Sequence, residues 1–188
     1  WTNILTSAVN GTAYAITEGL DGLLYVAGFF SNLNGDANQD AIASYNRTTT
    51  TWSALGTGLF FDVENKGLIV GPNGLLYVTG LLTSAGGVTV NGNAIWNGTS
   101  WQPLAGGLGA ASSAIVKMLP DGNVLFSASS LTTGGITFPD PIAKWTGGAF
   151  VPLDADLPMD VSTPATALAT SLDGKIAVAY ANPAATAT

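Results

Sequence analysis

Apolar residues along the chain fall in short runs that are separated by turn residues, and this pattern predicts β-strands rather than helices. The segments AYAITEGL (13–20) and LLYVAG (23–28) lie on either side of Asp21-Gly22. Asp-Gly between two apolar runs is typical of a β-hairpin, because both central positions of a type I′ turn need a positive φ. We therefore expect a hairpin over residues 13–28 with a type I′ turn at its tip.

This turn glycine recurs along the chain at a nearly constant period, which is the signature of an internal repeat. Its four copies are separated by 52, 48 and 52 residues, and each follows an Asp or an Asn. An aromatic residue recurs with a similar period, in steps of 51, 49 and 49 residues. The repeated positions are Gly22, Gly74, Gly122 and Gly174 for the turn, and Trp1, Trp52, Trp101 and Phe150 for the aromatic residue.

A third apolar run lies between the glycine and the aromatic residue, at 41–46, 93–97 and 141–146. Four short strands joined by tight turns form an antiparallel meander, and a radial array of such sheets is a β-propeller. Strands that are apolar almost throughout fit this arrangement, because neighbouring sheets cover both faces. We expect an all-β propeller of four-stranded blades, partial or incompletely closed, with a solenoid as the alternative. The expected division is an outer strand of a preceding blade at 1–9, blades at 10–59, 60–108 and 109–157, and the first two strands of a further blade at 158–188.

Two stretches carry a resemblance to a known family. LYVAG followed by IASYNRTTTTWSAL, with Tyr45 seven residues before Trp52, resembles a kelch repeat. YVTGLLTSAGG with AIWNGTSWQPLAGGL is similar to the kelch-like propeller repeats of secreted bacterial and phage structural proteins. The chain departs from kelch in its paired glycines after the strand, in the spacing of five from Trp96 to Trp101, and in a degenerate fourth copy. The resemblance implies a propeller on a virion or outside a bacterial cell, and it carries over no catalytic residue.

Composition excludes several function classes. The chain has no Cys and no His, so thiol chemistry, imidazole catalysis and sites built from those ligands are excluded. Its net charge is −7 and its five basic residues are scattered, which argues against nucleic-acid binding. No run approaches the roughly 18 apolar residues of a membrane-spanning helix, so we expect no membrane insertion. We do not expect an enzyme.

The segment SNLNGDANQD (31–40) holds the strongest candidate ligand-binding residues, because their oxygens alternate along one loop as calcium ligands do. The equivalent connections in the other copies lack these acids, and the pattern lacks the terminal glutamate of an EF-hand. The alternative is an ordinary set of turn residues. We expect no cofactor, with calcium as a possibility. The candidate residues are Asn34, Asp36, Asn38 and Asp40.

The sequence favours a non-catalytic structural or binding module on a phage tail, a capsid surface or a bacterial cell surface. Its blade loops would contact other protein subunits of an assembly, with surface glycans as a second partner class. The alternative is an extracellular propeller enzyme, such as a carboxylate-based glycosidase that uses Asp154, Asp156 and Asp160. Those acids are equally typical of a solvated turn. Phe60 and Phe61 are a candidate interaction patch, because they lie beside loop charges.

Overall fold

The structure is a computed structural model that describes residues 10–61, 67–104, 115–119, 121–127, 132–133, 136–137, 142–152, 165–171, 173 and 175–180. Trp1 and Gly174 lie outside these residues. The described chain is all-β and consists of several small antiparallel sheets, with two single-turn 3₁₀ helices, η1 (Leu33–Gly35) and η2 (Ala37–Gln39). The expected fold class is confirmed at this level.

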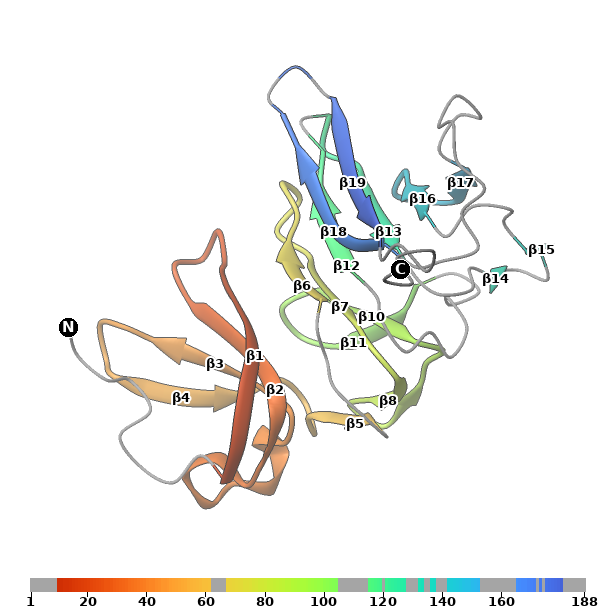
Figure 1. Cartoon of the computed structure of the whole chain (residues 1–188). Helices are drawn as coiled ribbons and strands as arrows, with labels where there is room; N and C mark the ends of the chain where they lie inside the picture. The colour runs from red at the N-terminus through yellow and green to blue at the C-terminus, as the bar shows by residue number, and fades with distance from the viewer. Residues whose placement is uncertain are drawn as a thin grey trace, which may run out of the picture.

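Three of the sheets have four strands each, and in each sheet the strands follow one another in chain order (Figure 1). The first sheet contains β1 (Asn10–Glu18), β2 (Leu24–Ser31), β3 (Ile42–Asn46) and β4 (Thr51–Ala54). The second contains β6 (Gly67–Val70), β7 (Leu76–Thr79), β10 (Asn93–Trp96) and β11 (Trp101–Pro103). The third contains β12 (Ile115–Met118), β13 (Val124–Ser127), β16 (Ile142–Trp145) and β17 (Phe150–Pro152), and a hairpin of β18 (Ala165–Thr170) and β19 (Ile176–Tyr180) follows.

The sheets stack through their apolar faces, and their first strands lie side by side: β1 beside β6, β6 beside β12, and β12 beside β18 (Figure 1). One buried layer, which includes Tyr25 and Leu76, lies between the first and second sheets. A second layer, with Tyr77 and Phe126, lies between the second and third sheets. Because each inner sheet is covered on both sides, its strands are apolar at consecutive positions.

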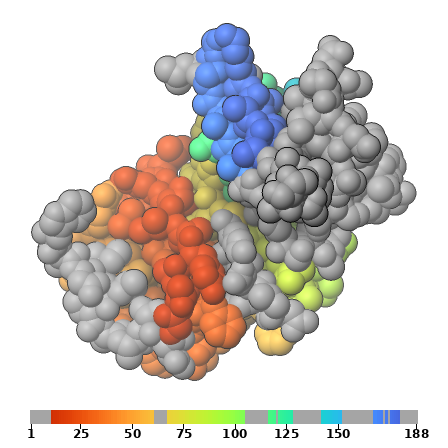
Figure 2. All heavy atoms as spheres, in the orientation of Figure 1, coloured from red at the N-terminus to blue at the C-terminus, as the bar shows by residue number. Residues whose placement is uncertain are grey.

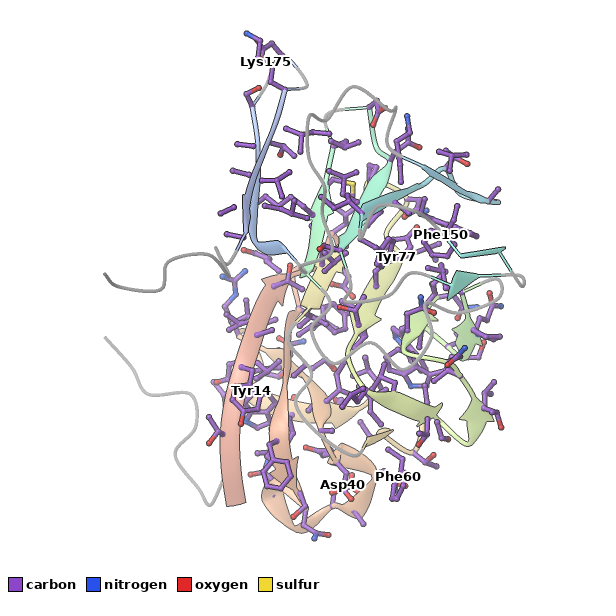
Figure 3. All side chains as sticks on the ribbon, turned by 45° about the vertical axis from the view of Figure 1, so that its right-hand side comes forward. Tyr14, Asp40, Phe60, Tyr77, Phe150 and Lys175 are labelled. Carbon is purple, nitrogen blue, oxygen red and sulfur yellow. The ribbon has the colours of Figure 1, made fainter. Side chains whose placement is uncertain are left out.

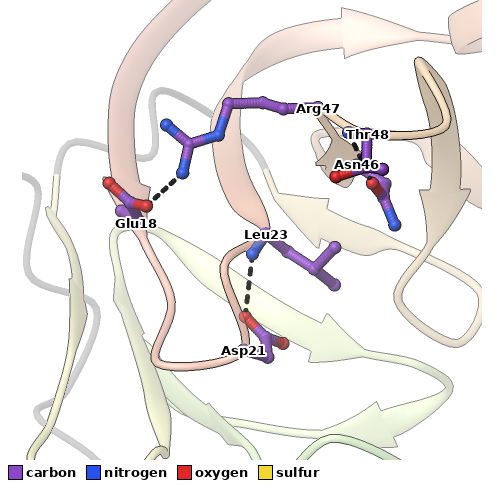
Figure 4. Close-up of polar contacts among 6 residues, drawn as sticks. All are labelled: Glu18, Asp21, Leu23, Asn46, Arg47 and Thr48. Atoms are coloured by element: carbon purple, nitrogen blue, oxygen red, sulfur yellow. Dashed lines mark hydrogen bonds and ion pairs between the residues drawn. The ribbon is translucent and has the colours of Figure 1, made fainter.

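In the first three repeats the turn between the first two strands is not of type I′, so this part of the expectation is wrong. The N–H of Gly22 donates to the carbonyl oxygen of Gly19 (3.0 Å), and Gly22 has φ +77° whereas Asp21 does not have a positive φ. This is the geometry of a type I turn followed by a left-handed glycine. Asp21 Oδ1 accepts a hydrogen bond from the N–H of Leu23 (3.0 Å; Figure 4), which holds the aspartate in the turn.

Two further small sheets lie outside the four-stranded pattern that the sequence predicted. β8 (Leu82–Ala85) pairs with β9 (Val88–Thr89) and with β5 (Leu59–Phe61), and β14 (Thr132–Thr133) pairs with β15 (Ile136–Thr137). The β8–β9 hairpin has two turn residues, Gly86 and Gly87, with φ +55° and +80°. The type I′ chemistry expected at Asp-Gly therefore occurs at this Gly-Gly pair, where both central residues have a positive φ.

Candidate functional site

The loop between β2 and β3 is held in place by one buried apolar side chain. Leu33 is 2% exposed and packs with Val26 and Phe30 of β2. Asn32 and Asn34 beside it adopt left-handed backbone conformations, with φ +49° and +54°. Asparagine tolerates this conformation better than most residues, so the asparagines of this loop serve its backbone shape.

The two aspartates among the candidate ligands accept hydrogen bonds from the loop itself. Asp36 accepts from the N–H of Asn38 (2.9 Å) and from the side-chain amide of Gln39 (3.1 Å). The bond from the backbone of Asn38, followed by the bond from Gln39, lowers the pKa of Asp36. Asp40 accepts from the N–H of Asn32 (2.6 Å). These bonds give both carboxylates a structural role within the loop.

A metal site is not formed by acidic residues within the described part of the chain. No group of three or more Asp or Glu side chains there is arranged so that it could hold a metal ion. This finding does not test the expectation of no cofactor, with calcium at the 31–40 loop as the alternative, because such a site would also draw on asparagine and backbone oxygens. The candidate acids Asp154, Asp156 and Asp160 lie outside the described residues.

A pocket beside the loop has a volume of about 390 Å³. Its walls are the end of β2 (29–31), Asp40 with Ala41, and Leu59 with Phe60 at the start of β5. Of the four candidate ligand residues, only Asp40 lines it. The side chains of Phe29 and Phe60 are 57% and 73% exposed, and Asp40 and Phe60 lie at the same end of the molecule (Figure 3).

The backbone at the base of this pocket is tightly connected. The N–H of Leu59 donates to the carbonyl oxygen of Asp40 (3.0 Å), and the N–H of Ala41 donates to that of Phe30 (2.9 Å). The buried Ala41 has φ +63°, a conformation that costs an alanine about 1–2 kcal/mol. The second repeat has a glycine at the corresponding position, Gly92, which donates to the carbonyl oxygen of Leu82 in β8 and accepts from the N–H of Gly80 just after β7, both at 3.0 Å. The pocket thus lies where the first repeat retains a strained residue.

The repeated tryptophans and phenylalanine pack within or beside the sheets. Trp101 is 4% exposed, and its indole N–H donates to the carbonyl oxygen of Leu55, which directly follows β4 of the first sheet (2.7 Å). Trp52 is half-buried and packs against Tyr45, with ring centroids 4.9 Å apart. Phe150 is half-buried beside Trp145, also at 4.9 Å. Trp101 is therefore not available as a platform for a ligand.

Phe29 was not among the candidates from the sequence, and Phe60 was a candidate only as part of the patch with Phe61. Phe29 follows Gly28 in a strand whose earlier residues are buried, so its position in the run resembles a core position. In the structure Phe29 lies opposite Thr12 of β1, and the pattern of this strand alone does not show that its side chain is exposed. The Asp62 and Glu64 that follow Phe60 lie outside the described residues.

Charged side chains elsewhere in the described chain form pairs on the surface. Arg47, in the turn between β3 and β4, pairs with Glu18 at the end of β1 (Figure 4). Lys175 pairs with Asp173 (2.8 Å) in the exposed β18–β19 hairpin, which projects at the top of the space-filling view (blue in Figure 2). Such exposed pairs contribute little to stability.

In the part of the chain that the structure describes, no helix has the length and apolar character needed to cross a membrane. The chain matches no protein-family model, and no curated protein matches it either.

Proposed function

We propose that this chain is a non-catalytic binding module, part of a β-propeller, which contacts its ligand through the pocket between Phe29 and Phe60. In this proposal the ligand is recognised beside the β2–β3 loop, which differs between the repeats, and the repeated strands form the scaffold. Folds of this kind host many functions, so the pocket and not the fold supports a role in binding.

The arrangement of the sheets supports the propeller part of the proposal. Each four-stranded sheet runs in chain order, and the first strands of successive sheets are neighbours. A radial array has this pattern, because the first strand of every blade lies nearest a common axis. The resemblance of the sequence to kelch-like repeats supports the same arrangement.

The two exposed phenylalanines are the observation that carries the binding function. Phe29 and Phe60 come from different sheets and line one pocket, with Asp40 and Ser31 as its polar groups. Ligand pockets are typically apolar concavities of this size with a few polar groups. Large exposed aromatic side chains are unfavourable in water, and their collection at one concave site is typical of an interaction surface.

The setting that best fits the chain is a virion or the surface of a bacterial cell. Only 9% of the residues are charged, which suits packing within an assembly better than a freely diffusing protein. Other protein subunits of the assembly are the first partner class, and surface glycans are the second. An enzymatic function, such as glycoside hydrolysis, stays the alternative hypothesis, and no observation on the described residues favours it.

Nuclear magnetic resonance (NMR) titration of the labelled chain tests the pocket directly. The probes are a panel of neutral mono- and disaccharides and a panel of short peptides with apolar or aromatic side chains. We expect amide shifts at 29–31, 40–41 and 59–60 with members of one panel, and their loss in the Phe60→Ser variant. Val88→Ser removes an exposed apolar side chain of β9 that does not line the pocket and should leave the shifts intact. Shifts confined to other residues, or none from either panel, would refute the assignment.

A further inference from the structure

Two polar side chains interrupt the apolar layer between the second and third sheets. Thr79 of β7 and Asn93 of β10 are directly opposite each other in the strand pairing. They are 0% and 1% exposed. Tyr77 and Ile95, two residues away along the same strands, belong to the apolar layer that packs against the third sheet. Because side chains alternate along a strand, Thr79 and Asn93 point into that same layer.

The amide of Asn93 lacks a hydrogen-bond partner on both of its polar atoms. Neither Oδ1 nor Nδ2 bonds to any of the described residues. A buried amide in this state is strongly unfavourable compared with one that is paired, because it has lost its hydration without replacement. Native proteins satisfy nearly all such groups, so an orphaned pair of atoms indicates a partner.

Comparison between the repeats shows that the fold itself does not require a polar residue at this position. The strand pairing places Ile42 opposite Ala27 in the first sheet and Ile142 opposite Ser127 in the third, as it places Asn93 opposite Thr79. Ile42 and Ile142 are both fully buried. An isoleucine therefore fits this position in two of three repeats, and the asparagine needs another explanation.

We propose that Asn93 binds one internal water molecule in the layer between the second and third sheets. A water molecule both donates and accepts, so it matches the carbonyl oxygen and the amino group of one amide. Buried waters of this kind are regular components of proteins, at polar sites too enclosed for larger molecules. A divalent cation fits poorly, because it needs more oxygen ligands than one amide and one hydroxyl supply.

The position of this water gives it a structural role at the base of the segment that connects β7 to β10. Asn93 follows Gly92, whose carbonyl oxygen accepts a hydrogen bond from the N–H of Gly80 (3.0 Å). The segment from Gly80 to Gly92 contains the β8–β9 hairpin, and β8 pairs with β5, which begins at the proposed binding pocket. The water site is independent of the proposed function, since neither Thr79 nor Asn93 lines that pocket.

A crystal structure of the wild-type chain that resolves ordered solvent tests the proposal without any substitution. We expect a water molecule within hydrogen-bond distance of the Asn93 amide. Direct bonds from both amide atoms to protein groups would overturn the proposal. So would an ion or an organic molecule at the site, or an amide with no partner at all.

Water oxygen-17 relaxation dispersion, which counts long-lived internal waters, provides an independent test in solution. We expect Asn93→Ile, which installs the residue of the other two repeats, to lose one long-lived water relative to the wild type. Ile142→Val alters the equivalent position of the third sheet without touching the amide, and it should keep the full count. An unchanged count in a folded Asn93→Ile variant would overturn the proposal. If that variant does not fold, the wild-type crystal structure still decides.

Discussion

Replacing Trp101 with phenylalanine tests whether the closing tryptophan of the second repeat joins two sheets. The indole lies 4% exposed in β11, and its N–H reaches the carbonyl oxygen of Leu55, 46 positions earlier, at 2.7 Å. The ring also packs directly over Gly86, where an added Cβ would come within 2.5 Å of Cδ1. Phenylalanine keeps an aromatic ring here but lacks the donor and the second ring.

The expected cost has two parts. Loss of the hydrogen bond costs about 1 kcal/mol, near the low end of the range for buried groups, because the Leu55 oxygen also accepts from the N–H of Gly58 at 3.3 Å. Loss of the second ring leaves a cavity between the sheets, which adds about 1–2 kcal/mol. The total of about 2–3 kcal/mol corresponds to a fall in melting temperature of roughly 5–10 °C for a domain of this length.

Equilibrium unfolding in urea, followed by far-ultraviolet circular dichroism, measures this difference. Trp52→Phe is the matched control, because Trp52 holds the same repeat position but is half-buried and retains its ring contact with Tyr45. We expect less than about 1 kcal/mol for the control. If both substitutions cost the same, Trp101 does not join the sheets as argued.

The turns and the loop give three further predictions. Gly86→Ala should cost more than about 2 kcal/mol, because the new Cβ meets the Trp101 ring. Gly87→Ala, whose Cβ would have nothing within 4 Å, should cost only the roughly 1 kcal/mol of its left-handed backbone. Urea unfolding of the two variants checks this difference, and equal losses of stability would contradict it. Burial, followed by the hydrogen bond to Asp21, raises the pKa of Tyr25. The contribution of Tyr25 to stability is therefore complete below about pH 10 and is lost as the pH rises through the pKa of the folded state. Tyr25→Phe should cost about 1 kcal/mol at neutral pH and should flatten this alkaline loss of stability, as unfolding curves at different pH values would show. Millimolar calcium should leave the melting temperature unchanged, because Asp36 already accepts hydrogen bonds within its loop, and a rise that Asp36→Ala abolishes would establish a calcium site.

The strand positions could be predicted because the signals that define them are local. Asp or Asn before glycine marks each first turn, and the apolar runs on either side form the pairs β1–β2, β6–β7 and β12–β13. The Asp21 side chain shows why the type of turn was missed. Whether that residue adopts a positive φ depends on its bond to the N–H of Leu23, and the dipeptide alone does not record this bond.

The binding pocket could not be predicted because it forms between segments that are far apart in the sequence. Phe29 lies near the end of β2 and Phe60 lies in β5 of another sheet, and the two segments are connected through the bond from the N–H of Leu59 to the carbonyl oxygen of Asp40. The strand pairing of β5 with β8 was missed for the same reason, since three residues carry no periodic signal. The candidate loop was identified in the sequence, but three of its four candidate residues do not line the pocket.

A contact within the first two hairpins explains why the repeats differ at particular positions. The hydroxyl of Tyr25 donates to Asp21 Oδ2 at 2.7 Å, and the ring lies so close to Gly19 that an added Cβ would approach it to 2.6 Å. In the second repeat the corresponding distance from Gly71 to the ring of Tyr77 is 3.1 Å. The turn side chains lie closer still, with Asp21 Oδ1 at 2.3 Å and Asn73 Oδ1 at 2.6 Å from the added Cβ, so in both hairpins the turn residue and the tyrosine together crowd this glycine.

The third and fourth copies lack both residues of this pair, as that constraint requires. Leu125 and Ala177 occupy the tyrosine position, and Leu119 and Ser171 occupy the glycine position, by the same strand pairing. Leu119 is buried there and packs with Leu125 in the layer that faces β18 and β19. The glycine and the tyrosine therefore change together because they are in contact, and each layer between sheets has its own packing solution. Since sheets with different faces cannot replace one another without loss of packing, the order of the repeats along the chain is itself part of what the sequence specifies.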